Sequence, residues 1–363
     1  MLNDPRLPVT LLSGFLGAGK TTVLNHLLSN PQGRRLGVIV NDLSPVNIDA
    51  GLIVRNDHGL VELSNGCICC TLREELVAQI AALARAGSLD ALLIESTGVS
   101  EPLPVAQGFL LESDGVPLSQ LARVDTLVTV VDASTFAQDF ATLQKVEDRD
   151  SAAPVEDRRN VVDLLVDQIE FADVLVLNKT DLASKRRLAE TRLRLKALNP
   201  QALVIETVRG ALDPSVVVAS RRFGWEASQS LPSWQRELTA KHVPETLEYG
   251  IANFSLVSEV PFHPGRLYRF FAKRRPALLR AKGWFTLATQ PGFSWLFHLA
   301  GRKKTIEFAG RFTGRHVELV FIGLWNPRQR ETFKKELEAC LLRPGESVGA
   351  EQDPFASYLE AAK

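Results

Sequence analysis

The sequence lacks the segments that mark a secreted or membrane-spanning chain. Its start, Met1-Leu2-Asn3-Asp4, has no basic segment followed by an apolar one, so we expect no secretory signal. No apolar run approaches about 18 residues, the length that a transmembrane helix needs. We therefore expect a cytoplasmic protein without a membrane-embedded part.

An excess of either charge is also missing. Lys and Arg number 42 and Asp and Glu number 42, so the formal net charge is zero. Proteins that bind nucleic acids or acidic membrane surfaces usually carry a marked basic patch or a basic overall charge. The short basic clusters at 34–35, 273–275 and 302–304 are most simply solvated surface. We therefore expect neither a nucleic-acid partner nor a membrane partner.

Cysteine is scarce and unevenly placed. Only four occur in 363 residues, and three of them are Cys67, Cys69 and Cys70. So few thiols exclude a small fold held together by disulfides. In a reducing compartment, a cluster of this kind is typical of a metal-binding or catalytic site.

What the sequence does contain is a complete phosphate-binding motif. Residues 14–22 read G-F-L-G-A-G-K-T-T, which fits G-x-x-x-x-G-K-[ST] between an apolar run and a helical pattern. Glycines let backbone N–H groups converge on a triphosphate, and the helix points its positive end at it. We expect Lys20 to contact the β- and γ-phosphates, Thr21 to bind Mg²⁺ and Thr22 to contact the α-phosphate. The predicted phosphate-binding residues are Gly14, Gly17, Ala18, Gly19, Lys20, Thr21 and Thr22.

Acidic residues follow two further apolar runs. Asp42 and Asp49 come after the run 36–40, where a first nucleotide-sensing loop is expected, and either can approach Mg²⁺ or a second metal. Their alternative roles are turn formation and helix capping. Glu95 ends the run 91–94, so we expect it to hold Mg²⁺ through water or to orient the attacking water, as a catalytic residue beside Lys20. Gly98 then places a backbone N–H near the γ-phosphate.

The tetrapeptide Asn178-Lys179-Thr180-Asp181 fits the guanine-recognition motif N-K-x-D and follows the apolar run 174–177. Guanine presents N1–H and N2–H₂ side by side, and the Asp181 carboxylate can accept both. Adenine has an acceptor at N1 and no donor at C2, so it leaves that carboxylate unpaired. We expect Lys179 to lie over the base and Asn178 to tie this loop to the phosphate loop. The motif therefore predicts GTP rather than ATP.

Apolar runs that alternate with helical patterns predict an α/β fold. We expect a P-loop GTPase domain with a doubly wound, mostly parallel sheet over 1–222, a linker at 223–245, and a smaller α+β C-terminal domain over 246–345. A loose tail is expected at 346–363. In the second domain the pattern predicts strands at 251–257, 279–288, 305–312 and 316–322 and helices at 266–273 and 331–342.

These motifs, in this order, resemble the CobW-type metallochaperone GTPases. The loop Ser64-Asn65-Gly66-Cys67-Ile68-Cys69-Cys70 is the most specific mark of the resemblance. The runs 280–283 (R-A-K-G) and 321–323 (F-I-G) look like the CobW C-terminal domain, and residues 40–50 resemble the YciC-like bacterial branch, which is associated with zinc limitation. The chain departs from many relatives by lacking a histidine-rich stretch and by having Asn41-Asp42-Leu43-Ser44 instead of Asn-Glu-x-Gly.

The resemblance implies a GTPase with slow intrinsic hydrolysis that delivers a metal to a client metalloprotein, and a homo-oligomer is left open. Three thiolates, from Cys67, Cys69 and Cys70, leave one corner of a zinc tetrahedron open to a client ligand. His58 and Asp49 are candidate fourth ligands. Thiolates favour Zn²⁺, and Co²⁺ also suits the set. Because the thiols lie between two nucleotide-sensing segments, we expect GTP, with Mg²⁺, to control metal binding.

Three other functions remain open from the residues. The first alternative is cobalt as the cargo, for cobalamin or metalloenzyme maturation. Cys67 and Cys70 form C-x-x-C, which also suits a thiol redox sensor. The third alternative is a non-catalytic zinc-binding module whose nucleotide site is structural.

Overall fold

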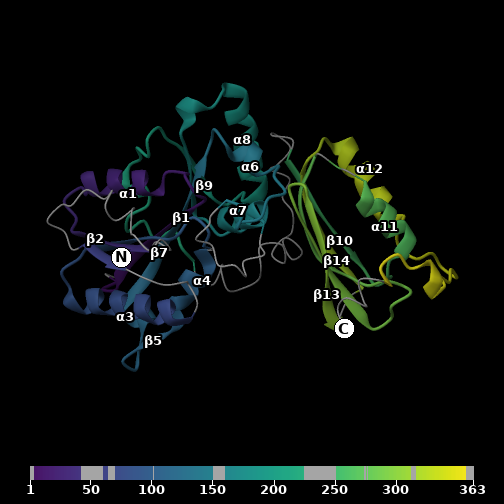
Figure 1. Cartoon of the computed structure of the whole chain (residues 1–363), viewed down its shortest axis with the longest axis horizontal. Helices are drawn as coiled ribbons and strands as arrows, with labels where there is room; N and C mark the ends of the chain where they lie inside the picture. Colours follow the sequence, from purple (N-terminus) through teal and green to yellow (C-terminus); the bar gives the residue numbers. More distant parts are fainter. Residues whose placement is uncertain are drawn as a thin grey trace. The chain divides into compact units, whose positions relative to one another are not determined.

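The computed structural model describes residues 4–41, 60–63, 70–100, 102–149, 160–224, 251–273, 275, 277–311 and 316–356. The chain divides into two compact units, with the boundary near residue 225 (Figure 1). The expected linker at 223–245 spans this boundary, and from 225 on it lies outside the described residues. Within the described parts, every helix is too short or too polar to cross a membrane.

The first unit is built on a seven-stranded sheet in which all neighbouring strands are parallel. The strand order is β3-β2-β4-β1-β7-β8-β9. The phosphate-loop strand therefore lies between β4 and β7, and the loops that follow these three strands open at one edge of the sheet. The strands are β1 (Leu7–Gly14), β2 (Leu36–Asn41), β3 (Leu60–Leu63), β4 (Ala91–Glu95), β7 (Ala122–Asp132), β8 (Val174–Asn178) and β9 (Leu203–Glu206).

Helices cover both faces of this sheet (Figure 1). On one face, Val23 and Leu24 of α1 (Lys20–Ser29) pack in one buried cluster with Leu12. On the other, Ile80 of α3 (Cys70–Ala86) packs with Leu11. Successive strand residues must then be apolar, because neither face meets water. The predicted doubly wound α/β fold is confirmed.

The remaining elements of the first unit are short or lie at its edges. They are α4 (Pro102–Gln107), η1 (Gly108–Leu110), β5 (Glu112–Ser113), β6 (Val116–Pro117), α5 (Leu118–Leu121), α6 (Phe136–Asp139), α7 (Val161–Glu170), η2 (Thr180–Leu182), α8 (Lys185–Leu198) and η3 (Pro214–Val216).

The second unit is an antiparallel five-stranded sheet with two helices, as the predicted α+β domain requires. The strand order is β10-β14-β11-β12-β13. Aromatic residues of both helices, such as Phe271 and Phe333, pack with strand residues such as Phe297 and Phe321 in one buried cluster. The elements are β10 (Ile251–Ser258), α11 (Pro264–Ala272), β11 (Leu278–Phe285), β12 (Phe293–Ala300), β13 (Lys303–Arg311), β14 (Val317–Leu324), α12 (Pro327–Glu338) and η5 (Ala350–Gln352).

Strand β12 is absent from the sequence-based prediction. Its inward residues Trp295, Phe297 and Leu299 are buried and alternate with more accessible neighbours. That period of two is the normal signature of a half-buried strand. The alternation that indicates a strand was therefore present in the sequence between residues 293 and 300.

The expectation of a loose tail is wrong for residues 346–356. Phe355 is fully buried in the core of the second unit, with its ring centroid 6.2 Å from that of Phe285. The Arg266 guanidinium also pairs with Glu346 at 2.7 Å. Burial of one large aromatic ring typically contributes about 1.5–3 kcal/mol, which helps to hold this segment against the second unit. Residues 357–363 lie outside the described residues.

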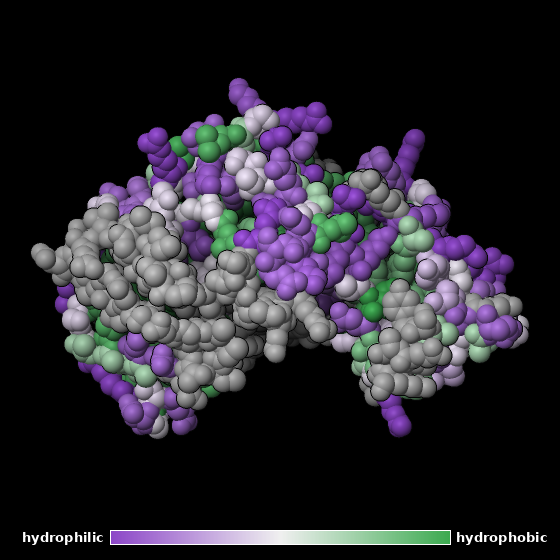
Figure 2. Space-filling view, in the orientation of Figure 1, coloured by the Kyte–Doolittle hydropathy of each residue, from purple (hydrophilic) through white to green (hydrophobic). Residues whose placement is uncertain are grey.

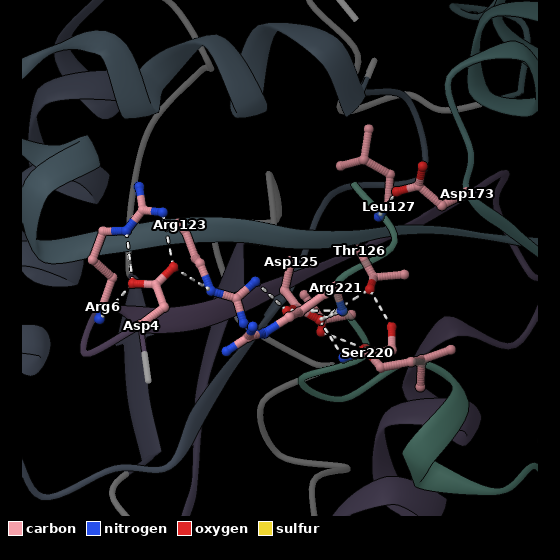
Figure 3. A network of polar contacts seen from close by, with 11 residues as sticks. Asp4, Arg6, Arg123, Asp125, Thr126, Leu127, Asp173, Ser220 and Arg221 are labelled. Atoms are coloured by element: carbon pink, nitrogen blue, oxygen red, sulfur yellow. Dashed lines mark hydrogen bonds and ion pairs between the residues drawn. The ribbon is translucent and has the colours of Figure 1, made fainter. Parts of the chain in front are cut away.

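A buried polar network fastens the end of the first unit to strand β7 (Figure 3). The Asp125 carboxylate is fully buried and accepts hydrogen bonds from the backbone N–H groups of Ser220 (2.6 Å) and Arg221 (3.2 Å). Arg123 pairs with the same carboxylate and also with Asp4. The segment that leads out of the first unit is thereby held at the edge of the sheet where β7 begins.

Asp173 lies just before β8, near this network, and gives a pH-dependent prediction. Burial raises the pKa of Asp173 to about 6, and the hydrogen bond from the Leu127 N–H (2.7 Å) and the nearby Arg222 charge offset only part of this. A carboxyl whose folded pKa lies above its unfolded pKa stabilises the fold only while it is protonated. This contribution is full below about pH 4 and is lost as the pH rises through about 6.

Asp173→Asn stays neutral and keeps an oxygen for the Leu127 N–H. We expect it to raise the free energy of unfolding by up to about 3 kcal/mol at pH 8, because a shift of one pKa unit corresponds to about 1.4 kcal/mol. The gain should shrink as the pH falls from 7 to 4.5. Urea unfolding of both proteins across this range measures it, and a gain that is the same at every pH would contradict the assignment.

Candidate nucleotide and metal site

The phosphate loop connects β1 to α1 with the backbone conformation that the motif predicts. Gly14 and Gly19 have φ values of 141° and 101°, in the region that favours glycine. A Cβ on Gly19 would lie 2.4 Å from the Asn178 side-chain nitrogen, so no larger residue fits there. Helix α1 has no side-chain cap and no acidic residue in its first turn. Its first N–H groups therefore have no side-chain acceptor at the cap, and such groups can bind an anion.

Lys20 and Thr21 are the last residues of the phosphate-binding motif and the first two residues of α1. Lys20 is 9% exposed, and its Nζ is 3.5 Å from the Phe15 carbonyl oxygen. The Thr21 hydroxyl donates a hydrogen bond of 2.8 Å to Oε1 of Glu95, which is itself 2% exposed at the end of β4. A hydroxyl and a carboxylate that converge beside a phosphate loop are hard oxygen ligands, which fit Mg²⁺.

The loop after Glu95 packs tightly on the phosphate loop. A Cβ on Gly98 would lie 2.5 Å from Leu16 Cδ2 and 3.0 Å from the Leu16 backbone nitrogen. Only glycine therefore allows this close approach. Ser96, two residues earlier, donates its backbone N–H to the Leu12 carbonyl of β1 at 2.9 Å. The Gly98 backbone therefore lies against the phosphate loop that leads into Lys20 and Thr21.

Asn178 joins the guanine motif to the phosphate loop. Its side-chain N–H₂ donates to the Ala18 carbonyl (3.1 Å), and its oxygen accepts from the Thr207 hydroxyl (3.1 Å) and the Gly210 N–H (2.9 Å). Both the nitrogen and the oxygen of the Asn178 side chain are therefore engaged inside the protein. The expected tie between the two loops is present, and the loop at Thr207 lies beside it.

Lys179 takes a left-handed conformation, with φ at 58°. Its Nζ donates to the Gly17 carbonyl and to Oδ2 of Asp132, both at 2.6 Å. These two hydrogen bonds connect Lys179 to the phosphate loop and to the end of β7. Asp181 is exposed, and its carboxylate accepts no hydrogen bond from the described residues. It is therefore free to accept the two donors of guanine.

Asp132, which ends β7, is a site residue that the motifs did not reveal. Burial alone would raise its pKa, but hydrogen bonds from Lys179 and Ser134 outweigh burial and hold the pKa of Asp132 below its ordinary value. The carboxylate is therefore charged at neutral pH and positions the Lys179 ammonium. The available signal was its place, an acid at the carboxyl end of the strand between the phosphate-loop strand and the guanine-motif strand.

Asp132→Asn keeps the shape but removes the charge that holds Lys179. We expect GDP and GTP affinities to fall together by roughly fivefold, since a charge-assisted hydrogen bond exceeds a neutral one by about 1 kcal/mol. Fluorescent-nucleotide titration measures both. Asp139→Asn, a removal of one acidic charge on α6, is the control and should leave both affinities unchanged. A full retention of affinity in Asp132→Asn would contradict the role.

The predicted metal ligands lie in other parts of the chain. Cys67, Cys69, Asp42, Asp49 and His58 lie outside the described residues. Cys70 is the first residue of α3, and its side chain is also outside them. Elsewhere, in the parts that the structure describes, no cluster of three His, Cys, Asp or Glu side chains suits a metal ion. The roles of all these residues stay predictions.

Comparison with known proteins extends the likeness over most of the chain. The CobW/HypB/UreG nucleotide-binding domain matches residues 8–206, and the cobalamin synthesis protein cobW C-terminal domain matches residues 251–341. A zinc-regulated GTPase metalloprotein activator 1 of Dictyostelium discoideum is 37% identical over 385 aligned residues, which cover 94% of this chain and 81% of that relative. The zinc chaperone CobW of Pseudomonas aeruginosa is 36% identical over 59% of this chain and 60% of its own length. The zinc chaperone YjiA of Escherichia coli is 31% identical over 89% and 96%.

Proposed function

Because the chain belongs to the CobW/HypB/UreG family, we propose that it is a GTP-hydrolysing zinc chaperone that passes Zn²⁺ to a client metalloprotein under nucleotide control. The observation that carries the proposal is the convergence of the phosphate loop, Glu95 and the guanine motif at one sheet edge, in a chain 37% identical to a zinc-regulated GTPase over 94% of its length.

The described residues supply the parts of a GTPase. Backbone N–H groups of the loop and the Lys20 ammonium bind the phosphates, while Asp181 selects guanine. Thr21 and Glu95 would hold Mg²⁺, which when bound neutralises charge on the phosphates. Glu95 is also placed to orient a water. Such parts without a partner's arginine give slow turnover, on the order of 10⁻⁴ to 10⁻² s⁻¹.

Strand β3 ends at Leu63 on the edge of the sheet at which β1 also ends, and α3 begins at Cys70. In the sequence, Cys67 and Cys69 fall between these two elements. In the order β3-β2-β4-β1, three strand steps of about 4.8 Å separate β3 from the phosphate-loop strand, roughly 14 Å in all. The helix N-terminus at Cys70 favours a thiolate, the form that binds metal.

Zinc titrations of the protein loaded with a non-hydrolysable GTP analogue or with GDP test the proposal. A coupling free energy of about 1–3 kcal/mol between the sites predicts zinc affinities that differ roughly 5- to 150-fold. Equal affinities would contradict nucleotide control. Elemental analysis of the protein purified in both states decides between zinc and cobalt as cargo.

Zinc affinities of single cysteine variants test whether Cys67, Cys69 and Cys70 are the zinc ligands. Replacing any one of Cys67, Cys69 and Cys70 by serine should weaken zinc binding by about 100-fold or more, because zinc binding of roughly 10–16 kcal/mol is shared among about four ligands. Cys340→Ser is the matched control. Cys340 is buried in the second unit, which raises the pKa of its thiol to about 11 and keeps it protonated. A loss of zinc binding in this control alone would contradict the assignment.

A further inference from the structure

A buried glutamine of α7 contacts the loop that carries Gly98. Gln168 is 1% exposed, and its side-chain N–H₂ donates to the carbonyls of Gly98 (3.3 Å) and Ser100 (3.0 Å). Both partners are acceptors, so the orientation of the amide group is fixed by chemistry. The Gln168 backbone carbonyl also accepts a hydrogen bond from the Thr129 hydroxyl of β7 (2.7 Å). The donor is therefore anchored to the central sheet.

The same face of α7 supports this loop with apolar contacts. Val161, Leu164 and Leu165 pack in one buried cluster with Val99 of the loop and Phe15 of the phosphate loop. Positions 161, 164, 165 and 168 are spaced so that they share one face of a helix. One helix face thus backs both phosphate-contacting segments, and its single polar residue is Gln168.

The two polar atoms of the Gln168 amide differ in their contacts. The oxygen has no hydrogen-bond partner among the described residues. An apolar residue at this position would leave the carbonyls of Gly98 and Ser100 without their donor, which typically costs about 1–3 kcal/mol for a buried polar atom. The N–H₂ group, in contrast, fixes two successive carbonyl positions of the loop.

We propose that Gln168 is a positioning residue that holds the loop 97–100 so that the Gly98 N–H meets the γ-phosphate of GTP. The inference rests on the proposed GTPase function and names a residue for discriminating GTP from GDP. GDP has no γ-phosphate, so it gains nothing from an ordered Gly98 N–H. Gln168 therefore stabilises the triphosphate complex selectively, without contacting the nucleotide.

Gln168→Met, which keeps length and removes both donors, tests the assignment. We expect the affinity for a non-hydrolysable GTP analogue to fall roughly tenfold while the GDP affinity stays within about twofold, since two neutral hydrogen bonds are at stake. The single-turnover hydrolysis rate should fall as well. Gln168→Glu is the second variant: its carboxyl donates only when protonated, so the analogue affinity should recover as the pH is lowered.

Asn199→Leu is the matched control. Asn199 is another buried amide; it donates to the carbonyls of Ile169 and Glu170 at the end of α7 and to that of Ala172 just beyond it, and not to the Gly98 loop. It should lower the thermal stability about as much as Gln168→Met but leave the ratio of GTP-analogue to GDP affinity unchanged. An equal loss of both affinities in Gln168→Met, or the same change of ratio in Asn199→Leu, would overturn the inference. A wild-type protein without guanine-nucleotide binding would overturn the proposed function itself.

Discussion

Asp181→Asn is expected to lower GTP affinity by a factor on the order of 10² to 10³ and to create affinity for xanthosine triphosphate. The Asp181 carboxylate is exposed and accepts no hydrogen bond from the described residues, so it is available to accept both guanine donors. The asparagine amide retains one acceptor and gains a donor that faces the guanine N2–H₂. Each lost charge-assisted hydrogen bond is worth about 1.5–3 kcal/mol. Xanthine has a carbonyl at C2, which that new donor matches.

Competition titrations with the two triphosphates measure the switch. Glu190→Gln on α8 is the control, because Glu190 is an acid that pairs with Arg186 at the surface and takes no part in the site. It should leave both affinities as they are. If Asp181→Asn bound GTP as the wild type does, the guanine assignment would be lost, and with it the argument for GTP over ATP.

Lys20→Ala should lower the rate of GTP hydrolysis by about 10²- to 10³-fold, the effect typical of removing one preorganised donor from developing charge. Lys20 is nearly buried, and its Nζ lies beside the Phe15 carbonyl of the phosphate loop. Single-turnover hydrolysis at saturating GTP measures the effect. Zinc binding by the nucleotide-free variant should match that of the wild type, since the thiols lie on a different segment.

Lys185→Ala, on the exposed first turn of α8, removes the same charge away from the loop and should hydrolyse GTP normally. Lys20→Ala also separates the chaperone from a metal-binding module that does not use its nucleotide. If this variant still delivered zinc to a client at the wild-type rate, nucleotide control would be contradicted even though the GTPase assignment stood.

Several parts of the site were predictable from the sequence because they depend on short sequence motifs. The phosphate loop needs glycines at fixed offsets between a strand and a helix, and the guanine motif needs its acid just after a strand. The parallel sheet was predictable for a similar reason: strands covered on both faces are continuously apolar. Local chemistry and local periodicity carry this information.

The residues that position the site were not predictable in this way. Asp132 acts on Lys179 from 47 residues away, and Gln168 contacts Gly98 from 70 residues away. Phe355 is buried beside Phe285, although its own segment has no periodic pattern. No local rule connects such pairs, because a strand-end acid or a glutamine on a helix is compatible with many partners.

The sequence by itself determined the P-loop fold and predicted the phosphate loop, the guanine motif and the three thiol ligands, because each of these is a short local motif. The tertiary structure decided how firmly these groups are held: strand order placed Asp132 beside Lys179, and the packing of α7 placed an amide donor against the Gly98 loop. The physical reason is that side-chain identity specifies a chemical capability, whereas distance and burial set the strength of a contact, and these arise only when remote segments pack together.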